Sequence, residues 1–206
     1  MNEHTETHDF DRPYWEQHWQ QAHRSEPGAA KAMGPNPHLV RETSGLTPGT
    51  ALDAGCGEGG EARWLASHGW DVTAADISSE ALARAAEASK NVNWVQADLT
   101  TWTPATEFDL VMTHYAHPSI PQLAFYDRIS EWVAPGGTLL IVGHLHGAGH
   151  GHHPAEASAT AATITARLDA ATWDVVTAEE QARTLTAPDG RTVPLHDVIV
   201  RATRHP

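Results

Sequence analysis

The sequence feature that most constrains the fold of this chain is an apolar strand that runs directly into a glycine-rich turn. Residues 51–60 read Ala-Leu-Asp-Ala-Gly-Cys-Gly-Glu-Gly-Gly, and a second acid, Asp76, follows one strand–helix–strand unit later. Glycines such as Gly55 and Gly57 let the backbone bend sharply and approach a ligand closely. A carboxylate at the end of the second strand can accept hydrogen bonds from both hydroxyls of a ribose. The sequence therefore predicts an α/β fold with a nucleoside site, in which Asp76 anchors the ribose and Ile77 lies beside it.

From residue 50 onward, apolar strands alternate with helical segments. Such alternation is typical of a doubly wound, mostly parallel, Rossmann-like sheet with helices on both faces. Two later segments resemble strands joined at Pro188-Asp189-Gly190, which is a hairpin signal. The parallel sheet is therefore expected to finish in a C-terminal antiparallel hairpin. The predicted strands are 50–54, 70–76, 92–97, 108–114, 138–143, 173–186 and 192–203, and the predicted helices in this part are 59–68, 79–89, 119–132 and 155–168.

The N-terminal part precedes this pattern. Residues 1–11 resemble a loose tail, and helices are expected at 12–24 and about 37–45. A chain of 206 residues suits one domain, with residues 1–47 as tail and cap helices and 48–206 as the Rossmann-like core. Aromatic residues gather on one face of the first helix, among them Tyr14 and Trp15. They form either a lid over the bound ligand or an apolar face packed on the sheet, and both roles can hold together.

Composition excludes several classes of function. The chain has 13 Lys and Arg against 26 Asp and Glu, a formal net charge of −13, and no basic cluster, so a nucleic-acid partner is not expected. No apolar run is long enough to span a membrane. One cysteine, Cys56, excludes an internal disulfide and favours a reducing cytoplasm. Cys56 lies within the glycine turn, where it is expected to border the ligand as a small packing residue, because Asp53 and Glu58 would raise the pKa of its thiol.

Gly55-x-Gly57-x-x-Gly60 also satisfies the fingerprint of dinucleotide-binding folds, a weak motif by itself. The carboxylates of Asp53 and Glu58 disfavour a pyrophosphate there. Asp53 could instead bind an ammonium group, through water or the loop amides, or order the turn by accepting backbone N–H groups.

Another acid, Asp98, ends the third strand and can take an adenine amino group, with the apolar Leu99 beside the ring. A ligand that combines adenosine with a cationic amino acid and lacks phosphate fits these features. S-adenosylmethionine is such a ligand.

Taken together, the motifs resemble those of class I S-adenosylmethionine-dependent methyltransferases. The stretch 58–66 is also similar to the small-molecule branch linked to tellurite and thiopurine resistance, which often carries an aromatic N-terminal helix. The resemblance implies a seven-stranded sheet whose last strand is antiparallel, and in-line transfer of a sulfonium methyl to a small-molecule acceptor. The matching segments are Leu52–Gly60, Val72–Ser78, Gln96–Leu99, Phe108–Val111 and Val133–Leu140.

The segment after the fourth strand supplies candidates for the acceptor side. His114, Tyr115 and His117 lie where ligand and catalytic groups gather in open α/β sheets, so they could bind substrate or accept a proton. Polar loop residues without chemistry are the alternative. The segment is not Asp/Asn-Pro-Pro-Tyr/Phe, a departure that argues against methylation of a base amine or a protein amide.

A histidine-rich, glycine-rich run follows the fifth strand. Its imidazoles could bind a metal ion, but a glycine-rich loop lacks fixed geometry, so no metal site is predicted and a pH-sensitive loop bordering the substrate mouth is favoured. Two other functions stay open, namely an NAD-dependent oxidoreductase and a non-catalytic nucleoside- or metal-binding module. The five histidines are His144, His146, His150, His152 and His153.

Overall fold

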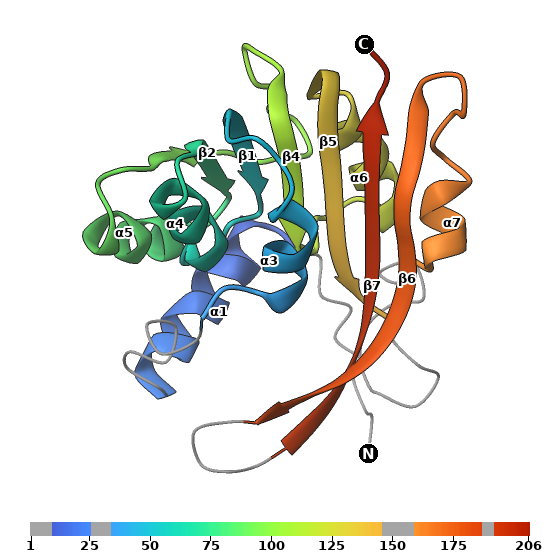
Figure 1. Ribbon diagram of the computed structural model, residues 1–206. Helices are drawn as coiled ribbons and strands as arrows, with labels where there is room; N and C mark the ends of the chain where they lie inside the picture. Colours follow the sequence, from blue (N-terminus) through green and yellow to red (C-terminus); the bar gives the residue numbers. More distant parts are fainter. Residues whose placement is uncertain (1–9, 26–33, 146–158, 187–191) are drawn as a thin grey trace.

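The structure of the protein is a computed structural model that describes residues 10–25, 34–145, 159–186 and 192–206. Seven strands form one sheet in the order β3-β2-β1-β4-β5-β7-β6 (Figure 1). Neighbouring strands from β3 to β5 are parallel, whereas β7 is antiparallel to both β5 and β6. The predicted fold class is confirmed. The strands are β1 (Thr50–Ala54), β2 (Asp71–Asp76), β3 (Asn93–Gln96), β4 (Phe108–His114), β5 (Val133–His144), β6 (Trp173–Thr186) and β7 (Thr192–Arg204).

Two hydrophobic cores lie on opposite faces of the sheet, because successive strand residues point to opposite sides. Leu52 packs in the core that holds residues of α6 and α7, and Ala51 packs in the core that holds residues of α3, α4 and α5. The result is a three-layer sandwich (Figure 1). The helices are α1 (Arg12–Ser25), α3 (Pro37–Thr43), α4 (Gly60–Ser67), α5 (Ser79–Ala88), α6 (Gln122–Ser130) and α7 (Ala161–Thr165).

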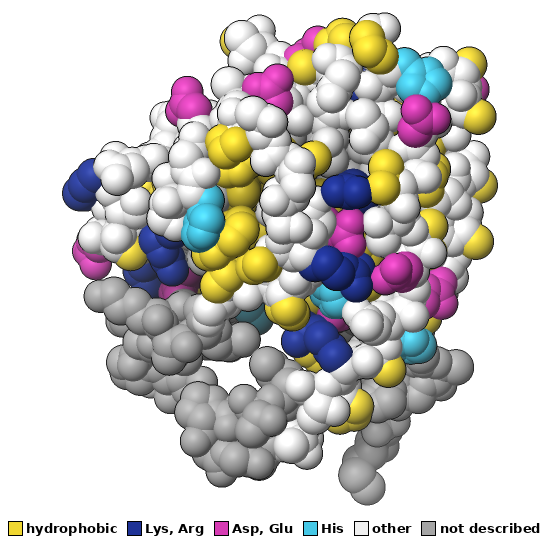
Figure 2. All heavy atoms as spheres, viewed as in Figure 1, with side chains coloured by type: hydrophobic (Ala, Val, Ile, Leu, Met, Phe, Trp, Pro, Cys, Tyr) yellow, Lys and Arg dark blue, Asp and Glu magenta, His cyan; other side chains and the backbone are white. Residues whose placement is uncertain are grey.

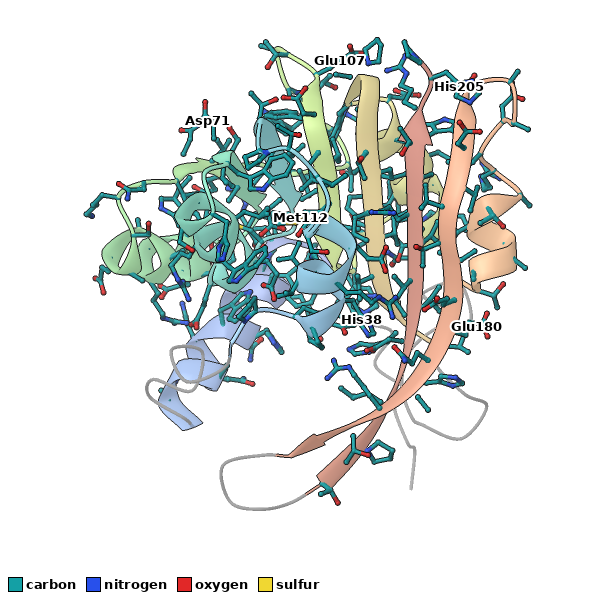
Figure 3. All side chains as sticks on the ribbon, viewed as in Figure 1. His38, Asp71, Glu107, Met112, Glu180 and His205 are labelled. Carbon is teal, nitrogen blue, oxygen red and sulfur yellow. The ribbon has the colours of Figure 1, made fainter. Side chains whose placement is uncertain are left out.

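The carboxyl ends of the parallel strands meet at one edge of the sheet, and α1 lies against that edge (Figure 1). Asp71, at the start of β2, and Glu107, just before β4, lie at the opposite end of the sheet from His38 (Figure 3). The edge beside α1 is where α/β sheets bind ligands.

Three predicted elements differ from the observed ones by more than two residues at one or both ends. The strand expected at 138–143 begins earlier, at Val133. The segment Pro135-Gly136-Gly137 lies within it as a pairing irregularity, where the register with β4 shifts from Phe108↔Val133 to Leu110↔Thr138. The helix expected at 119–132 begins at Gln122, since Pro118 and Pro121 hold the preceding segment out of the helix.

The helix expected at 155–168 is reduced to α7, which begins after a capping box at Thr160. The prediction for 155–158, the turn at Pro188-Asp189-Gly190, and His146, His150, His152 and His153 fall outside the described residues.

On the face drawn in Figure 2, basic side chains are interleaved with acidic ones over α3 and the last two strands. Glu42 illustrates the pattern, because it pairs with Arg41 at 2.7 Å and with Arg201 at 3.3 Å. These arginines are therefore neutralised locally. Among the described helices, none has the length and apolar character that crossing a membrane requires.

Candidate functional site

A cavity of about 580 Å³ opens at the carboxyl ends of the parallel strands, under α1. Every site residue that the sequence predicted lines it, with the exception of Asp53. The wall also includes groups that sequence reasoning did not single out for the site. The predicted lining residues are Tyr14, Trp15, Gly55, Cys56, Gly57, Asp76, Ile77, Asp98, Leu99, His114, Tyr115 and His117, and the additional ones include Phe10, His18, Glu61 and Arg63. His144, expected in a loop that borders the substrate mouth, also lines the cavity, but as the last residue of β5.

The glycine turn after β1 forms the floor. Gly55 and Gly57 adopt φ angles of 82° and 52°, in the left-handed region that favours glycine. A Cβ at Gly57 would lie 2.7 Å from Cζ2 of Trp19, and a Cβ at Gly55 would lie 2.5 Å from Cβ of Ala116. Glycine at positions 55 and 57 is therefore required by the packing of neighbouring side chains as well as by the backbone conformation of the turn.

Asp76 ends β2 at the cavity edge and organises that turn. Its Oδ2 accepts from the backbone N–H of Gly57 at 2.8 Å, and its Oδ1 accepts from the backbone N–H of Ser78 at 2.9 Å. Burial raises the pKa of Asp76, although these backbone hydrogen bonds oppose the shift. Ser78 supplies the N-cap of α5 by accepting from Ala81 N at 3.2 Å.

Asp98 lines the cavity beyond β3. Its Oδ1 accepts from the backbone N–H of Thr100 at 2.9 Å and from the Thr100 hydroxyl at 2.6 Å. One carboxylate oxygen therefore orders the loop, and the other remains for a different contact.

Asp53 lies beneath the turn and does not line the cavity. Its carboxylate is hydrogen-bonded to the backbone of Ala62 in α4, and its Oδ2 atom, in the described part of the chain, has no hydrogen-bond partner. Burial first, and then the negative charges of Glu61 and Asp76, raise its pKa well above the usual value, while a hydrogen bond to the backbone of Ala62 opposes this. The turn is thus ordered by Asp76 rather than by Asp53.

Cys56 is buried, and burial followed by the charges of Asp53 and Asp76 raises the pKa of its thiol well above the usual value. The direction agrees with the sequence prediction, but Glu58 is not among the causes. Glu58 instead forms an ion pair of 2.8 Å with Arg84.

The helix α1 closes one side of the cavity with aromatic rings. Phe10 stacks between Trp15 and His117, with ring centroids 6.1 Å and 5.6 Å away. The indole N–H of Trp15 donates to the carbonyl of His117 at 3.2 Å. Tyr14 and Trp15 thus line the cavity, and α1 packs against α5. That this helix acts as a lid over a bound ligand stays a prediction.

A single carboxylate fixes α1 to α5. Glu16 accepts hydrogen bonds from the backbone N–H groups of Ser79 and Glu80 at 2.8 Å and 3.1 Å, and from the hydroxyls of Ser78 and Ser79 at 2.9 Å and 2.8 Å. It therefore caps the α5 N-terminus from another helix.

His114 presents a neutral imidazole to the cavity. Its two ring nitrogens are buried and, within the described ranges, form no hydrogen bond. Burial lowers the pKa of His114 to about 4, and the nearby charge of Glu61 offsets this only in part. The ring is thus uncharged near neutral pH and is a weak base.

Tyr115 is held in an unusual conformation by polar partners. Its φ of 55° is uncommon for an aromatic residue. Its hydroxyl accepts from Asn36 Nδ2 and Arg183 Nη2, each at 2.9 Å, and its ring stacks on His144 with centroids 4.0 Å apart. Burial raises the pKa of Tyr115 despite the Arg183 hydrogen bond.

Sequence reasoning missed Asn36, Arg183 and Asp197, because no local motif marks them. Asn36 precedes α3 as its N-cap, whereas Arg183 and Asp197 lie on β6 and β7. Only sheet pairing brings the last two beside Tyr115 and His144.

Comparisons with known proteins agree with this architecture. Residues 51–137 match the family described as "Methyltransferase domain". The trans-aconitate 2-methyltransferase of Streptomyces avermitilis is 33% identical over 129 residues, which are 57% of this chain and 45% of the relative. A probable thiol methyltransferase of Arabidopsis thaliana is 32% identical over 115 residues, or 51% of this chain and 50% of the relative. The matches thus cover half or less of these two relatives.

Solved structures share the fold at lower identity. TehB from Haemophilus influenzae has a TM-score of 0.67 and 17% identity, over 83% of this chain and 62% of that one. The 1,6-didemethyltoxoflavin-N1-methyltransferase of Burkholderia thailandensis, solved with S-adenosylhomocysteine, has a TM-score of 0.63 and 20% identity, over 95% and 87%. Residues 51–137 therefore match a methyltransferase domain, and the chain shares the fold of these solved structures.

Proposed function

We propose that this protein transfers a methyl group from S-adenosylmethionine to a small-molecule acceptor. The observation that carries the proposal is a cavity at the carboxyl ends of the parallel strands, edged by the carboxylates of Asp76 and Asp98 and walled by aromatic rings of α1. The donor has a cationic amino-acid part and an adenosine but no phosphate, so carboxylates suit it better than a cluster of amide donors would.

The donor half of the cavity follows from the donor's chemistry. When bound, S-adenosylmethionine supplies an electrophilic methyl group on a positively charged sulfur. Asp76 accepts hydrogen bonds from the ribose hydroxyls, with Ile77 beside it. Asp98 uses the oxygen that Thr100 leaves free to accept from the adenine amino group, and Leu99 packs against the ring.

The turn completes the donor half. Gly55, Cys56 and Gly57 form its wall. Asp53 does not line the cavity, so its role toward the ammonium group is indirect, through the turn or a water molecule.

The acceptor half is formed by Tyr115, His114 and His117 with the α1 rings. His114 is neutral near pH 7 and can bind or orient an acceptor through its ring nitrogens. Tyr14 and Trp15 exclude water over the sulfur. Most of the rate enhancement comes from holding nucleophile, methyl carbon and sulfur in line.

The acceptor class is a small molecule. The relatives' names refer to trans-aconitate, a thiol and 1,6-didemethyltoxoflavin. We propose no nucleic-acid partner and a reducing, cytoplasmic site of action, which the single cysteine and the net charge of −13 support.

Two measurements test the function. Calorimetry with S-adenosylhomocysteine and with NADH should show binding of the first alone. Incubation with methyl-labelled donor and a panel of thiols, phenols and amines should move the label. Binding of NADH alone would favour an oxidoreductase, and donor binding without transfer to any acceptor would favour a non-catalytic binding module.

A further inference from the structure

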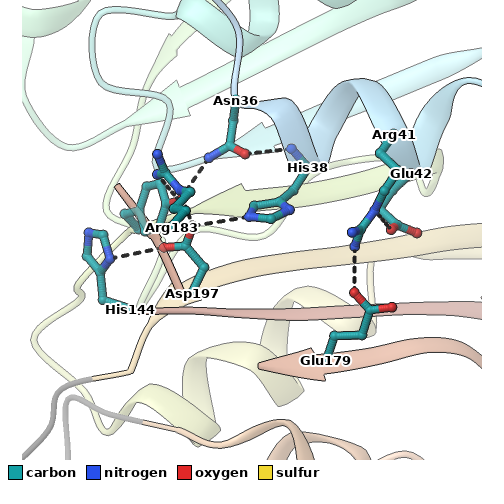
Figure 4. Close-up of polar contacts among 9 residues, drawn as sticks. Asn36, His38, Arg41, Glu42, His144, Glu179, Arg183 and Asp197 are labelled. Carbon is teal, nitrogen blue, oxygen red and sulfur yellow. Dashed lines mark hydrogen bonds and ion pairs between the residues drawn. The ribbon is translucent and has the colours of Figure 1, made fainter. Parts of the chain in front are cut away.

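Asp197, on β7, is a fully buried carboxylate at which three proton-bearing side chains from different elements converge (Figure 4). Its Oδ2 contacts Arg183 Nε from β6 and lies 3.1 Å from His38 Nε2 in α3. Its Oδ1 lies 3.5 Å from His144 Nδ1 in β5, within ion-pair distance, and the described residues give that oxygen no hydrogen bond. One oxygen is therefore shared by Arg183 and His38, and the other faces His144.

The sheet itself builds the pair. His144 and Asp197 are directly opposite each other in the antiparallel register of β5 and β7. Directly paired residues have side chains close enough to interact. The bond from Leu145 N to His196 O at 2.7 Å continues the pairing past this point. The geometry thus comes from strand pairing rather than from a loop.

The His144 ring is oriented from two sides. It stacks on Tyr115 with centroids 4.0 Å apart and planes inclined by 17°, and its Nδ1 faces the carboxylate. Both rings line the cavity. A carboxylate at Nδ1 favours the tautomer that carries its proton there, which leaves the lone pair of a neutral imidazole on Nε2.

His114, which also lines the cavity, lacks this arrangement. The His114 ring nitrogens have no carboxylate within hydrogen-bond distance among the described residues, and burial lowers the pKa of His114 to about 4. His117 stacks on Phe10 and accepts the Trp15 N–H through its backbone. Although burial opposes it, the contacts with His144, Arg183 and His38 hold the pKa of Asp197 well below its usual range, so Asp197 is ionised.

We propose that His144 is the general base for the methyl acceptor, that Asp197 is its positioning residue, and that the acceptor is a phenol or amine that carries a proton on its nucleophilic atom. This rests on the proposed function. The acceptor's O–H or N–H proton passes to Nε2 of His144 as the oxygen or nitrogen forms its bond to the methyl carbon. The bond from that carbon to sulfur breaks, and its electron pair stays on sulfur. Asp197 neutralises the imidazolium, which then releases its proton to water.

The test compares acceptors that differ in their need for a base. Phenol or an aromatic amine needs proton removal, whereas thiophenol is already largely a thiolate at pH 7.5. In His144→Gln, the ratio of kcat/KM for phenol to kcat/KM for thiophenol should fall by about 10²-fold or more, and Asp197→Asn should lower the same ratio. A matched control is His205→Gln, whose imidazole pairs with Asp174 at 3.2 Å at the far end of the sheet (Figure 3). In this control variant, the ratio of kcat/KM for phenol to kcat/KM for thiophenol should not change.

A second readout is independent of turnover. Long-range ¹H–¹⁵N correlation spectra of uniformly labelled protein, assigned with His144→Gln, should show His144 protonated on Nδ1. Asp197→Asn should shift it toward the other tautomer, because the new amide can donate where the carboxylate accepted.

An unchanged ratio in His144→Gln, an equal loss with both acceptors, a wild-type protein that methylates thiols alone, or His144 protonated on Nε2 would overturn the proposal. Calorimetry with S-adenosylhomocysteine separates this from failure of the proposed function. If the wild-type protein binds none, the methyltransferase proposal itself falls. Should Asp197→Asn fail to fold, His144→Gln, at a partly exposed position, still decides between the outcomes.

Discussion

At the scale of single residues, two acidic side chains near the turn have different surroundings and different roles. Asp76 is 8% exposed at the cavity edge and accepts two backbone hydrogen bonds, so its charge is compensated. Asp53 is 2% exposed beneath the turn, and one of its oxygens makes no hydrogen bond within the described chain. The first is suited to binding a ligand, and the second costs stability when it is ionised.

Replacing Asp76 with Ala should raise the dissociation constant for S-adenosylhomocysteine on the order of 100-fold, because hydrogen bonds to a charged acceptor are lost. Calorimetry measures this. The control is Asp71→Ala, an exposed acid at the other end of the same strand (Figure 3). Equal affinity in Asp76→Ala and the parent protein would refute the assignment of Asp76 to the ribose.

Asp53→Asn should stabilise the protein at neutral pH. The pKa of Asp53 is raised in the folded state, so folded protein holds its proton above the unfolded value near 3.8, and wild-type stability falls as pH rises through that window. Asparagine cannot ionise, so the variant does not lose stability in this way. The free energy of unfolding should exceed that of the wild type by ~1–3 kcal/mol at pH 7 and by much less at pH 4.

Urea denaturation at pH 4 and pH 7 measures the free energy of unfolding of the variant and of the wild type. The explanation fails if the difference between variant and wild type is the same at pH 4 and pH 7.

At the scale of elements, the shape of the cavity depends on the contacts that hold α1 in place. Glu16 accepts four hydrogen bonds at the start of α5, and Arg84 of α5 donates to the carbonyl of Trp19 at 3.1 Å. Trp19 in turn packs against the bare backbone of Gly57. The aromatic wall is therefore held by polar contacts at its ends and by a glycine beneath it.

Glu16→Ala should loosen α1 without unfolding the sheet. Losing a helix cap costs about 1–2 kcal/mol, so amides of α1 should exchange with solvent about tenfold faster, while those of β1 and β4 keep their protection. Hydrogen exchange measures this, with Gln17→Ala, an exposed neighbour on the same helix, as the control. Uniformly faster exchange over the whole sheet would show instead that Glu16 supports global stability.

The same contact has a defined pH dependence. Despite burial, the hydrogen bonds from Ser79, Glu80 and Ser78 lower the pKa of Glu16 below its usual 4.5. A lowered folded-state pKa gives stability that is present above 4.5 and is lost as pH falls through the folded-state value. Protection of α1 should therefore weaken below about pH 4.5 and hold at neutral pH.

At the scale of the whole molecule, charge dominates behaviour in solution. The formal net charge is −13 with 15 neutral histidines, and the sequence isoelectric point is about 5.5. Protonation of histidines near their reference pKa of about 6.5 removes much of that charge. Turbidity should therefore pass through a maximum near pH 5.5 during acidification. A clear, concentrated solution throughout that range would count against this account.

The sequence by itself determined the alternation of strands and helices, the turn at 55–60, and the carboxylates after β2 and β3, because these are local patterns of hydrophobicity and backbone freedom. It overestimated the helices at 119–132 and 155–168 and placed the start of β5 too late, since proline and sheet register decide those ends. It expected Asp53 to bind an ammonium group through water or the loop amides, or to order the turn, and the structure has Asp53 buried outside the cavity lining.

Only the tertiary structure decided which distant groups meet. The register of β7 against β5 sets Asp197 opposite His144, and α3 brings His38 to the same carboxylate from the far N-terminal side of the chain. Such pairings depend on strand order and on long-range packing, which leave no periodic mark in the sequence. The proposed donor half of the cavity is thus formed by contiguous motifs. The proposed acceptor half combines the contiguous segment 114–117 with His144 and Asp197, which only strand pairing brings to it.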